Sequence, residues 1–345
     1  MRTKFNYYYP PSDEREEEIR TNGFYVIDTN VLLDILRLGK DLAEKAIVTI
    51  VGNKDRVRVP FYVAYEYHKH FRRVIYDQVR NLEKAKENIT IDQVFSHVLN
   101  LLENVRLPKT DRESLKSAFE EPTRMLLQKI EELYNYYESI SQGLELQERI
   151  ATTLDDSVLD EINSDTLQQY EAEAQKRYKA LIPPGYKDSK KRDNKYGDYI
   201  IWQEILKFAK VQNCDIIFVS GDLKEDWQEI HNGKKLCPRY ELQKEFQKTV
   251  PNKYFRTVTL DRFLEMLDSN HFSEVEMAEV KSIAVDMERI RTKPTVPITP
   301  EALESVEALL AKMDNLHNSE SQIIDQEEIE LEMASSSKKK DPLGE

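Results

Sequence analysis

Four short apolar runs are separated by longer stretches whose apolar positions recur at helical spacing. The runs span residues 24–28, 57–60, 216–219 and 254–258. Continuous apolar runs are typical of strands that are buried on both faces, and repeats every three or four residues are typical of helices. Strands that alternate with helices predict an α/β fold, with a parallel sheet flanked by helices. The helices expected in this body are 29–38, 41–51, one from about 61, one from 198, 240–246 and 263–267.

A helical pattern without strands occupies residues 81–181. It is broken locally at Pro108, Pro122 and Gly143 and contains no exact repeat. A connection of about a hundred residues is far longer than an ordinary loop. We therefore expect a large helical insertion, folded as a hairpin or arm, within a domain that spans 23–268.

Different compositions precede and follow this domain. Residues 1–22 form a polar N-terminal segment, and 269–317 read as a helical extension with amphipathic helices at 273–291 and 301–316. The acidic tail, 318–345, is expected to be disordered. It can serve as a solubilising tail, as an arm that docks a partner, or as an acidic flap that competes with nucleic acid.

Composition and charge narrow the class of protein. Of the 345 residues 40% are hydrophobic, and there is no apolar run of membrane-spanning length, so we expect no membrane partner. Two cysteines and the lack of a leader favour a cytoplasmic protein. The net charge of −13 argues against non-specific polyanion binding, yet 17 acidic and 8 basic residues lie in 272–345 alone. Most of the excess acid is thus outside the α/β body.

Carboxylates stand where such a sheet places its ligands. Asp28 and Asp222 directly follow strands, Asp198 opens a helix, and Glu66 lies in the second turn of the helix from 61. Ligands of open α/β sheets bind beyond the carboxyl ends of the strands, where the strand order reverses. Clustered carboxylates repel one another when empty but suit a hard divalent cation. A cation held there can activate water for phosphodiester hydrolysis.

Each acid also has an ordinary interpretation. Asp28 and Asp198 can be helix caps, and Glu66 can be a solvated helix charge. Asp226, four residues after Asp222, can cap a following helix instead of serving the cation. Only the set of acids, taken together, favours a metal site.

Four segments, taken in order, resemble the acidic motifs of PIN-domain ribonucleases. They are Val26–Asp34, Val59-Pro60 with Glu66, Tyr196–Tyr199 and Phe218–Asp222. In addition, Ile182–Asp188 and Asp222–Trp227 are similar to a longer bacterial PIN-like subfamily with a helical insertion. The roughly hundred-residue insertion and the C-terminal extension depart from the small toxin-type pattern.

The resemblance implies a metal-dependent nuclease, most simply an endoribonuclease, with Mg²⁺ or Mn²⁺ and a role in a toxin or defence system. Its implied catalytic and metal-binding acids are Asp28, Glu66, Asp198 and Asp222, with Asp226 as an additional or outer acid. Asn30 and Ser220 match positions that orient ligands or water. RNA is favoured over DNA as the nucleic acid substrate.

A catalytically silent PIN-like scaffold is the competing function. Such a protein would act through the helical arm and the C-terminal extension, which could equally dock a protein regulator of an active enzyme. A homo-oligomer is also compatible with the sequence.

Basic residues gather just before Asp198. Lys190, Lys191, Arg192 and Lys195 lie in the loop that leads into its helix, so we expect them to contact substrate phosphates. Arg177 is a weaker candidate for the same role. The ordinary interpretation is a solvated loop.

Overall fold

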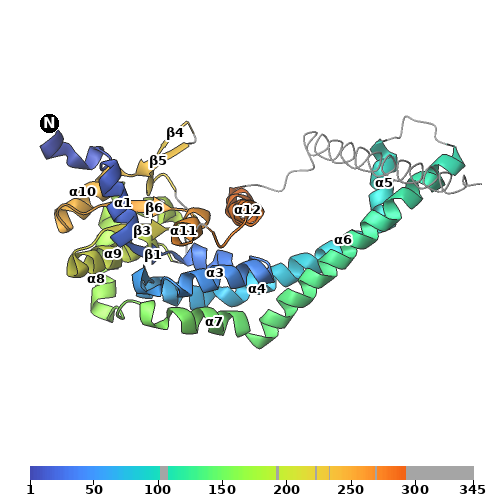
Figure 1. Ribbon diagram of the computed structural model, residues 1–345, viewed down its shortest axis with the longest axis horizontal. Coiled ribbons are helices and arrows are strands. Elements are labelled where there is room, and N and C mark those ends of the chain that lie inside the picture. The colour runs from blue at the N-terminus through green and yellow to red at the C-terminus, as the bar shows by residue number, and fades with distance from the viewer. Residues whose placement is uncertain (102–107, 192–193, 222–223, 233, 269, 293–345) are drawn as a thin grey trace, which may run out of the picture. The chain divides into compact units, whose positions relative to one another are not determined.

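The computed structural model describes residues 1–101, 108–191, 194–221, 224–232, 234–268 and 270–292. It contains a four-stranded parallel sheet in the order β2-β1-β3-β6. The α/β fold with a helix-flanked parallel sheet is confirmed (Figure 1). The strands are β1 (Phe24–Ile27), β2 (Val57–Arg58), β3 (Ile216–Val219) and β6 (Phe255–Val258).

The strand order reverses between β1 and β3. From β1 the chain goes first to β2 on one side and later to β3 on the other. The register pairs Phe24 with Ile216 and Ile27 with Val219, so both strands end level. Asp28 donates its backbone N–H to the carbonyl of Val219 at 2.9 Å. The residues that follow the two strands therefore meet at the switch point of the sheet.

Helices cover both faces of this sheet (Figure 1). Those of the body are α1 (Asp13–Asn22), α2 (Thr29–Ile35), α3 (Lys40–Val51), α8 (Ser164–Lys179), α9 (Gly197–Gln212), α10 (Tyr240–Thr249), α11 (Leu260–Leu267) and α12 (Glu274–Thr292). Short 3₁₀ helices are η1 (Arg2–Tyr8), η2 (Lys54–Arg56), η3 (Asp155–Ser157) and η4 (Tyr186–Lys190). The apolar runs read as strands are buried; for example, Ile27, Val219 and Phe255 have no exposed surface.

The expected insertion is a long helical hairpin. α4 (Phe61–Asn88) and α6 (Lys109–Gly143) run side by side, with α5 (Ile91–Leu101) at the far end and α7 (Glu145–Leu154) on the return (Figure 1). Lys86 of α4 pairs with Glu131 of α6 across this arm. The returning chain adds a bridge beside β2, where Val59 pairs with Val158. The arm thus begins and ends at the edge of the sheet.

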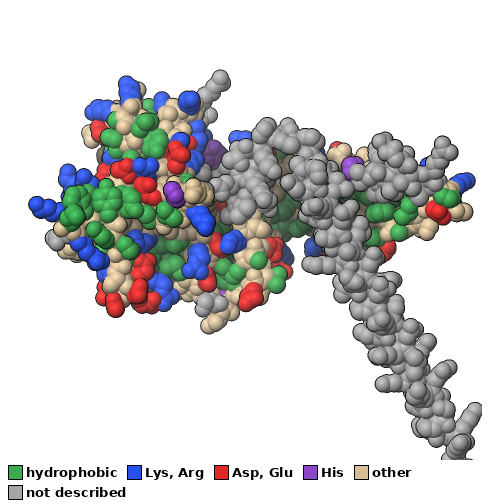
Figure 2. Space-filling view, turned by 90° about the horizontal axis from the view of Figure 1, so that it is seen from above, with side chains coloured by type: hydrophobic (Ala, Val, Ile, Leu, Met, Phe, Trp, Pro, Cys, Tyr) green, Lys and Arg blue, Asp and Glu red, His purple; other side chains and the backbone are tan. Residues whose placement is uncertain are grey.

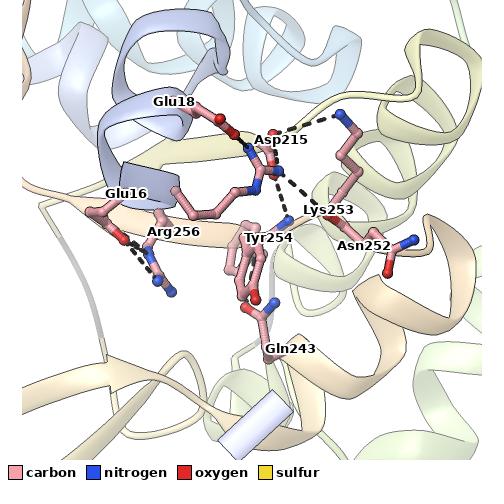
Figure 3. A network of polar contacts seen from close by, with 10 residues as sticks. Glu16, Glu18, Asp215, Gln243, Asn252, Lys253, Tyr254 and Arg256 are labelled. Carbon is pink, nitrogen blue, oxygen red and sulfur yellow. Dashed lines mark hydrogen bonds and ion pairs between the residues drawn. The ribbon is translucent and has the colours of Figure 1, made fainter. Parts of the chain in front are cut away.

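The polar N-terminal segment is folded onto the amino edge of the sheet. Asp215, directly before β3, accepts hydrogen bonds from the Arg15 guanidinium at 2.7 Å and from the backbone N–H of Tyr254 at 2.8 Å (Figure 3). Arg256 of β6 pairs with Glu16 at 2.9 Å. These contacts hold α1 at the end of the sheet opposite to Asp28.

An antiparallel hairpin, β4 (Gln228–His231) and β5 (Lys234–Pro238), was not expected. Its strands alternate poorly, since Lys234, Lys235 and Leu236 are all exposed. A turn signal, Asn232-Gly233, does stand in the sequence, and Asn232 adopts the positive φ of 50° that such turns require. The hairpin directly follows Asp226, where a capped helix was one of the two expectations.

The chain forms one compact unit from Met1 to Glu288. α12 closes it, with Val280 buried and Lys45 paired to Glu276. The expected helix at 301–316 and the acidic tail lie outside the described residues. No helix in the described part of the chain is both long and apolar enough to cross a membrane.

Candidate functional site

Asp28 is fixed at the carboxyl edge by three short hydrogen bonds. It caps α2, because its Oδ1 accepts from the Thr29 backbone N–H at 2.7 Å. Its Oδ2 accepts from the Ser220 hydroxyl at 2.6 Å and from the Asn30 amide at 2.8 Å. Asp28 can therefore cap α2 and also be a residue of the site. The two residues expected to orient ligands are the ones that orient Asp28.

Asn30 also links the two central strands. Its Oδ1 accepts from the Gly221 backbone N–H at 2.9 Å, directly after β3. Asp34 lies one helical turn further along α2 and faces Gly221. A Cβ built on Gly221 would lie only 3.4 Å from the Asp34 Oδ2. Asp34 is buried and bonded to Arg37 at 2.6 Å. Sequence reasoning gave no role to Asp34, although it belongs to the first acidic motif.

Glu66 reaches the same edge from α4. Its Oε2 accepts from the Thr29 hydroxyl at 2.6 Å, and its Oε1 accepts from the Asn194 amide. Burial raises the pKa of Glu66 to about 7; the Thr29 bond opposes this shift, and the negative charge of Asp28 adds to it. Glu66 is therefore not a solvated helix charge.

Glu204 sets the position of the helix that carries Glu66. This buried side chain on α9 accepts from the backbone N–H groups of Phe61 at 2.7 Å and Tyr62 at 3.1 Å. Pro60 precedes them and provides no side-chain cap, so Glu204 satisfies donors that the start of α4 leaves open. The bond fixes where α4 leaves the sheet.

Asp198 lies in the first turn of α9, against the loop before it. A Cβ on Gly185 would come within 2.9 Å of the Asp198 Cβ and 2.1 Å of the Tyr178 hydroxyl. Gly185 also has φ of 91°, which side chains rarely adopt. Burial raises the pKa of Asp198 to about 8; Lys224 lowers it, and Asp188, Asp226 and Asp28 raise it. Asp198 thus shares an electrostatic environment with Asp28.

Asp226 supports this loop. It is fully buried, and its Oδ2 accepts from the backbone N–H groups of Gly185 and Lys187, each at 3.1 Å. Its Oδ1 is also buried and has no hydrogen-bond partner among the described residues. The alternative that Asp226 caps a following helix is wrong, because β4 follows it. Its carboxylate instead holds the loop that packs on Asp198.

Two lysines of the basic loop, Lys187 and Lys191, are paired with nearby carboxylates. Asp188 bonds Lys191 at 2.6 Å and Lys224 at 3.0 Å, and Lys187 pairs with Glu225. Lys190 is exposed and makes no ion pair with a described residue, and the ammonium of Lys195 lies 5.1 Å from the Tyr196 ring. Arg192 lies outside the described residues. Lys190 and Lys195 therefore stay the better candidates for phosphate contact.

Arg177 is paired with a carboxylate. Its guanidinium bonds both carboxylate oxygens of Glu245 at 2.7 Å and lies over the Tyr199 ring. Only 12% of the side chain is exposed. A guanidinium already paired with a carboxylate is a structural group, so we do not retain Arg177 as a substrate contact.

Asp222 lies outside the described residues. Thr29 links Asp28 to Glu66, and the charge of Asp28 acts on Asp198. No group of three or more His, Cys, Asp or Glu side chains in the described ranges is close enough to hold a metal ion. The available donors are all carboxylate, hydroxyl or amide oxygens. Such a set suits Mg²⁺ or Mn²⁺ and not a soft metal.

Asn194 was missed by the sequence analysis. It donates to Glu66 and accepts from the Tyr62 hydroxyl at 2.9 Å, with φ of 52°. We expect Asn194→Gly, which tolerates this φ, to lower by about tenfold the phosphodiester hydrolysis expected from the sequence, because Glu66 loses its support. Asn213→Gly is the matched control, since Asn213 has φ of 48° at the other end of α9. Equal rates in both variants would contradict a positioning role.

Comparison with known proteins gives one match. A family model described as a PIN-like domain matches residues 24–242. No curated protein and no solved structure matches the chain.

Proposed function

Because the chain belongs to the PIN-like domain family, whose members are generally nucleases, we propose that it is a metal-dependent endoribonuclease. One observation carries this proposal: Thr29 donates its backbone N–H to Asp28 at 2.7 Å and its hydroxyl to Glu66 at 2.6 Å, so carboxylates from two distant segments meet at the carboxyl edge of the sheet. A site that concentrates carboxylates is suited to a divalent cation.

In this proposal Asp28, Glu66, Asp198 and Asp222 hold Mg²⁺ or Mn²⁺, and Asp226 acts from outside. The unpartnered, buried Oδ1 of Asp226 fits such a site, since a buried carboxylate oxygen without a donor calls for a cation or water. When bound, the metal lowers the pKa of water and offsets charge on the phosphate.

The protein residues supply geometry. Thr29 and Asn194 fix the carboxylate of Glu66, and Ser220 with Asn30 fixes that of Asp28. The donor groups of Thr29, Asn194, Ser220 and Asn30 need not change their protonation during turnover. Lys190 and Lys195 border the site and would position the phosphate backbone.

The test is cleavage of labelled single-stranded RNA, structured RNA, and single- and double-stranded DNA, each with Mg²⁺, Mn²⁺ or EDTA. We expect cleavage of RNA with either metal and none in EDTA. A protein that cleaves no nucleic acid with either metal would refute the proposal. Preferential cleavage of DNA would keep the nuclease and change its substrate.

A further inference from the structure

A groove with aromatic and basic walls runs along β6, the edge strand of the sheet. Its volume is about 640 Å³, within the roughly 300–1,000 Å³ of ligand sites. Five lining residues come from β6 and its ends: Tyr254, Arg256, Thr257, Val258 and Thr259. The opposite walls are η1, the start of α10 and strand β5. This space is separate from the carboxylate site.

The charge of the groove is opposite to that of the whole chain. Its lining includes Lys235, Arg256 and Arg262 but only one carboxylate, Glu16, which is paired with Arg256. Arg262 pairs with Glu265 outside the groove and still has 63% of its side chain exposed. In a chain of net charge −13, a cationic groove favours a polyanion over a protein of ordinary charge.

The rings of this groove lie next to cations. Tyr7 and Tyr8 have ring centroids 4.7 Å apart, and Tyr8 lies 4.6 Å from Tyr240. The ammonium of Lys244 is 5.5 Å from the Tyr7 ring. Tyr8 is 51% exposed, so a face or an edge of its ring is open to solvent. Figure 2 shows hydrophobic-class side chains, which include tyrosine, gathered with Lys and Arg over the end that carries η1 and α10.

One end of the groove lies next to a residue that contacts the carboxylate site. Val258 and Thr259 line it, and the Val258 carbonyl accepts from the backbone N–H of Ser220 at 3.0 Å. Ser220 in turn donates to Asp28. On the other wall, the β4–β5 hairpin begins two residues after Asp226. The end of β6 therefore connects the lining of the groove to Ser220 and, through it, to Asp28.

We propose that this groove binds the single-stranded part of the substrate that lies beyond the cleaved phosphate. The tyrosines stack on bases and the cations contact phosphates, a combination suited to single strands without sequence preference. The inference rests on the proposed nuclease function and adds a second binding region to it. The structural alternative is that Tyr8 only anchors η1 on α10.

The experiment measures binding of fluorescent single-stranded RNA of about 4 and about 16 nucleotides, in Ca²⁺ to limit turnover. We expect Tyr8→Leu to weaken binding of the long RNA by about tenfold and to affect the short RNA little. Tyr8→Phe keeps the ring and should restore binding. Arg262→Gln should lower the salt slope for the long RNA by about 0.7, and Lys210→Gln on α9 is the control.

Three results would overturn the groove. If Tyr8→Leu and Arg262→Gln both bind the long RNA as tightly as the wild type does, the groove does not bind substrate. If the wild type nevertheless cleaves RNA in Mn²⁺, the proposed function stands. Equal losses in Tyr8→Leu and Tyr8→Phe would show that the Tyr8 hydroxyl, and not stacking of its ring on a base, accounts for the binding. A wild-type protein that neither binds nor cleaves RNA removes both the groove and the nuclease.

Discussion

Replacement of Asp28 by Asn is expected to reduce nuclease activity by about a hundredfold or more. Asp28 is the acid whose charge acts on both Glu66 and Asp198, so its loss removes the centre of the proposed metal site. The measurement is single-turnover cleavage of labelled RNA at saturating Mn²⁺. Asn keeps the size of the side chain, and the fold should therefore persist.

The matched control for Asp28→Asn is Asp41→Asn. Asp41 is exposed in the first turn of α3, so this variant makes the same chemical change away from the site. Wild-type rates are expected for it. Full activity in Asp28→Asn would remove the carboxylate cluster from the mechanism.

Thermal stability without metal is expected to fall as pH rises from about 5 to about 8. In the folded protein the pKa values of Glu66 and Asp198 are about 7 and about 8, above their ordinary values of 4.5 and 3.8. The folded state therefore binds more protons in this window, and its stability is lost as these groups ionise. Mn²⁺ should reverse the loss, with a rise of about 5–10 °C in Tm at pH 8 when metal is in hundredfold excess over its Kd.

Asp198→Asn separates this effect from general pH sensitivity. The Asp198 side chain makes no hydrogen bond to another described residue, so Asn should remove its charge at little structural cost. We expect a higher Tm than wild type in EDTA at pH 8 and a smaller response to Mn²⁺. Asp41→Asn is again the control, because both residues are second in their helices. If the Tm of the wild-type protein in EDTA does not change between about pH 5 and about pH 8, the proposed charge cluster is contradicted.

The sequence predicted the parts of the site that depend on strand ends. Asp28 and Ser220 follow buried apolar runs, and parallel strands bring such positions to one edge. Glu66 was predicted only as a member of a set, because one acid on a helix gives no direction. Asp222 stays a prediction, since it lies outside the described residues.

Contacts between distant segments could not be predicted in the same way. Asn194 reaches Glu66 only because the loop before α9 packs beside α4, and no local pattern encodes that approach. Arg177 was assigned from its nearness to the basic loop in sequence, whereas in three dimensions Glu245 pairs with it. The hairpin was missed because its strands lack the alternation of apolar and polar residues that would support the Asn232-Gly233 turn signal.

The position of β1 in the middle of the sheet has a consequence during synthesis. β1 leaves the ribosome early, but its neighbour β3 begins at Ile216 and the edge strand β6 ends at Val258. At about 5–20 residues per second, Asp28 waits roughly ten seconds to a minute before those strands exist. No shorter nascent chain can assemble the carboxyl edge. The proposed nuclease would therefore be harmless to the message that encodes it until translation has passed β6.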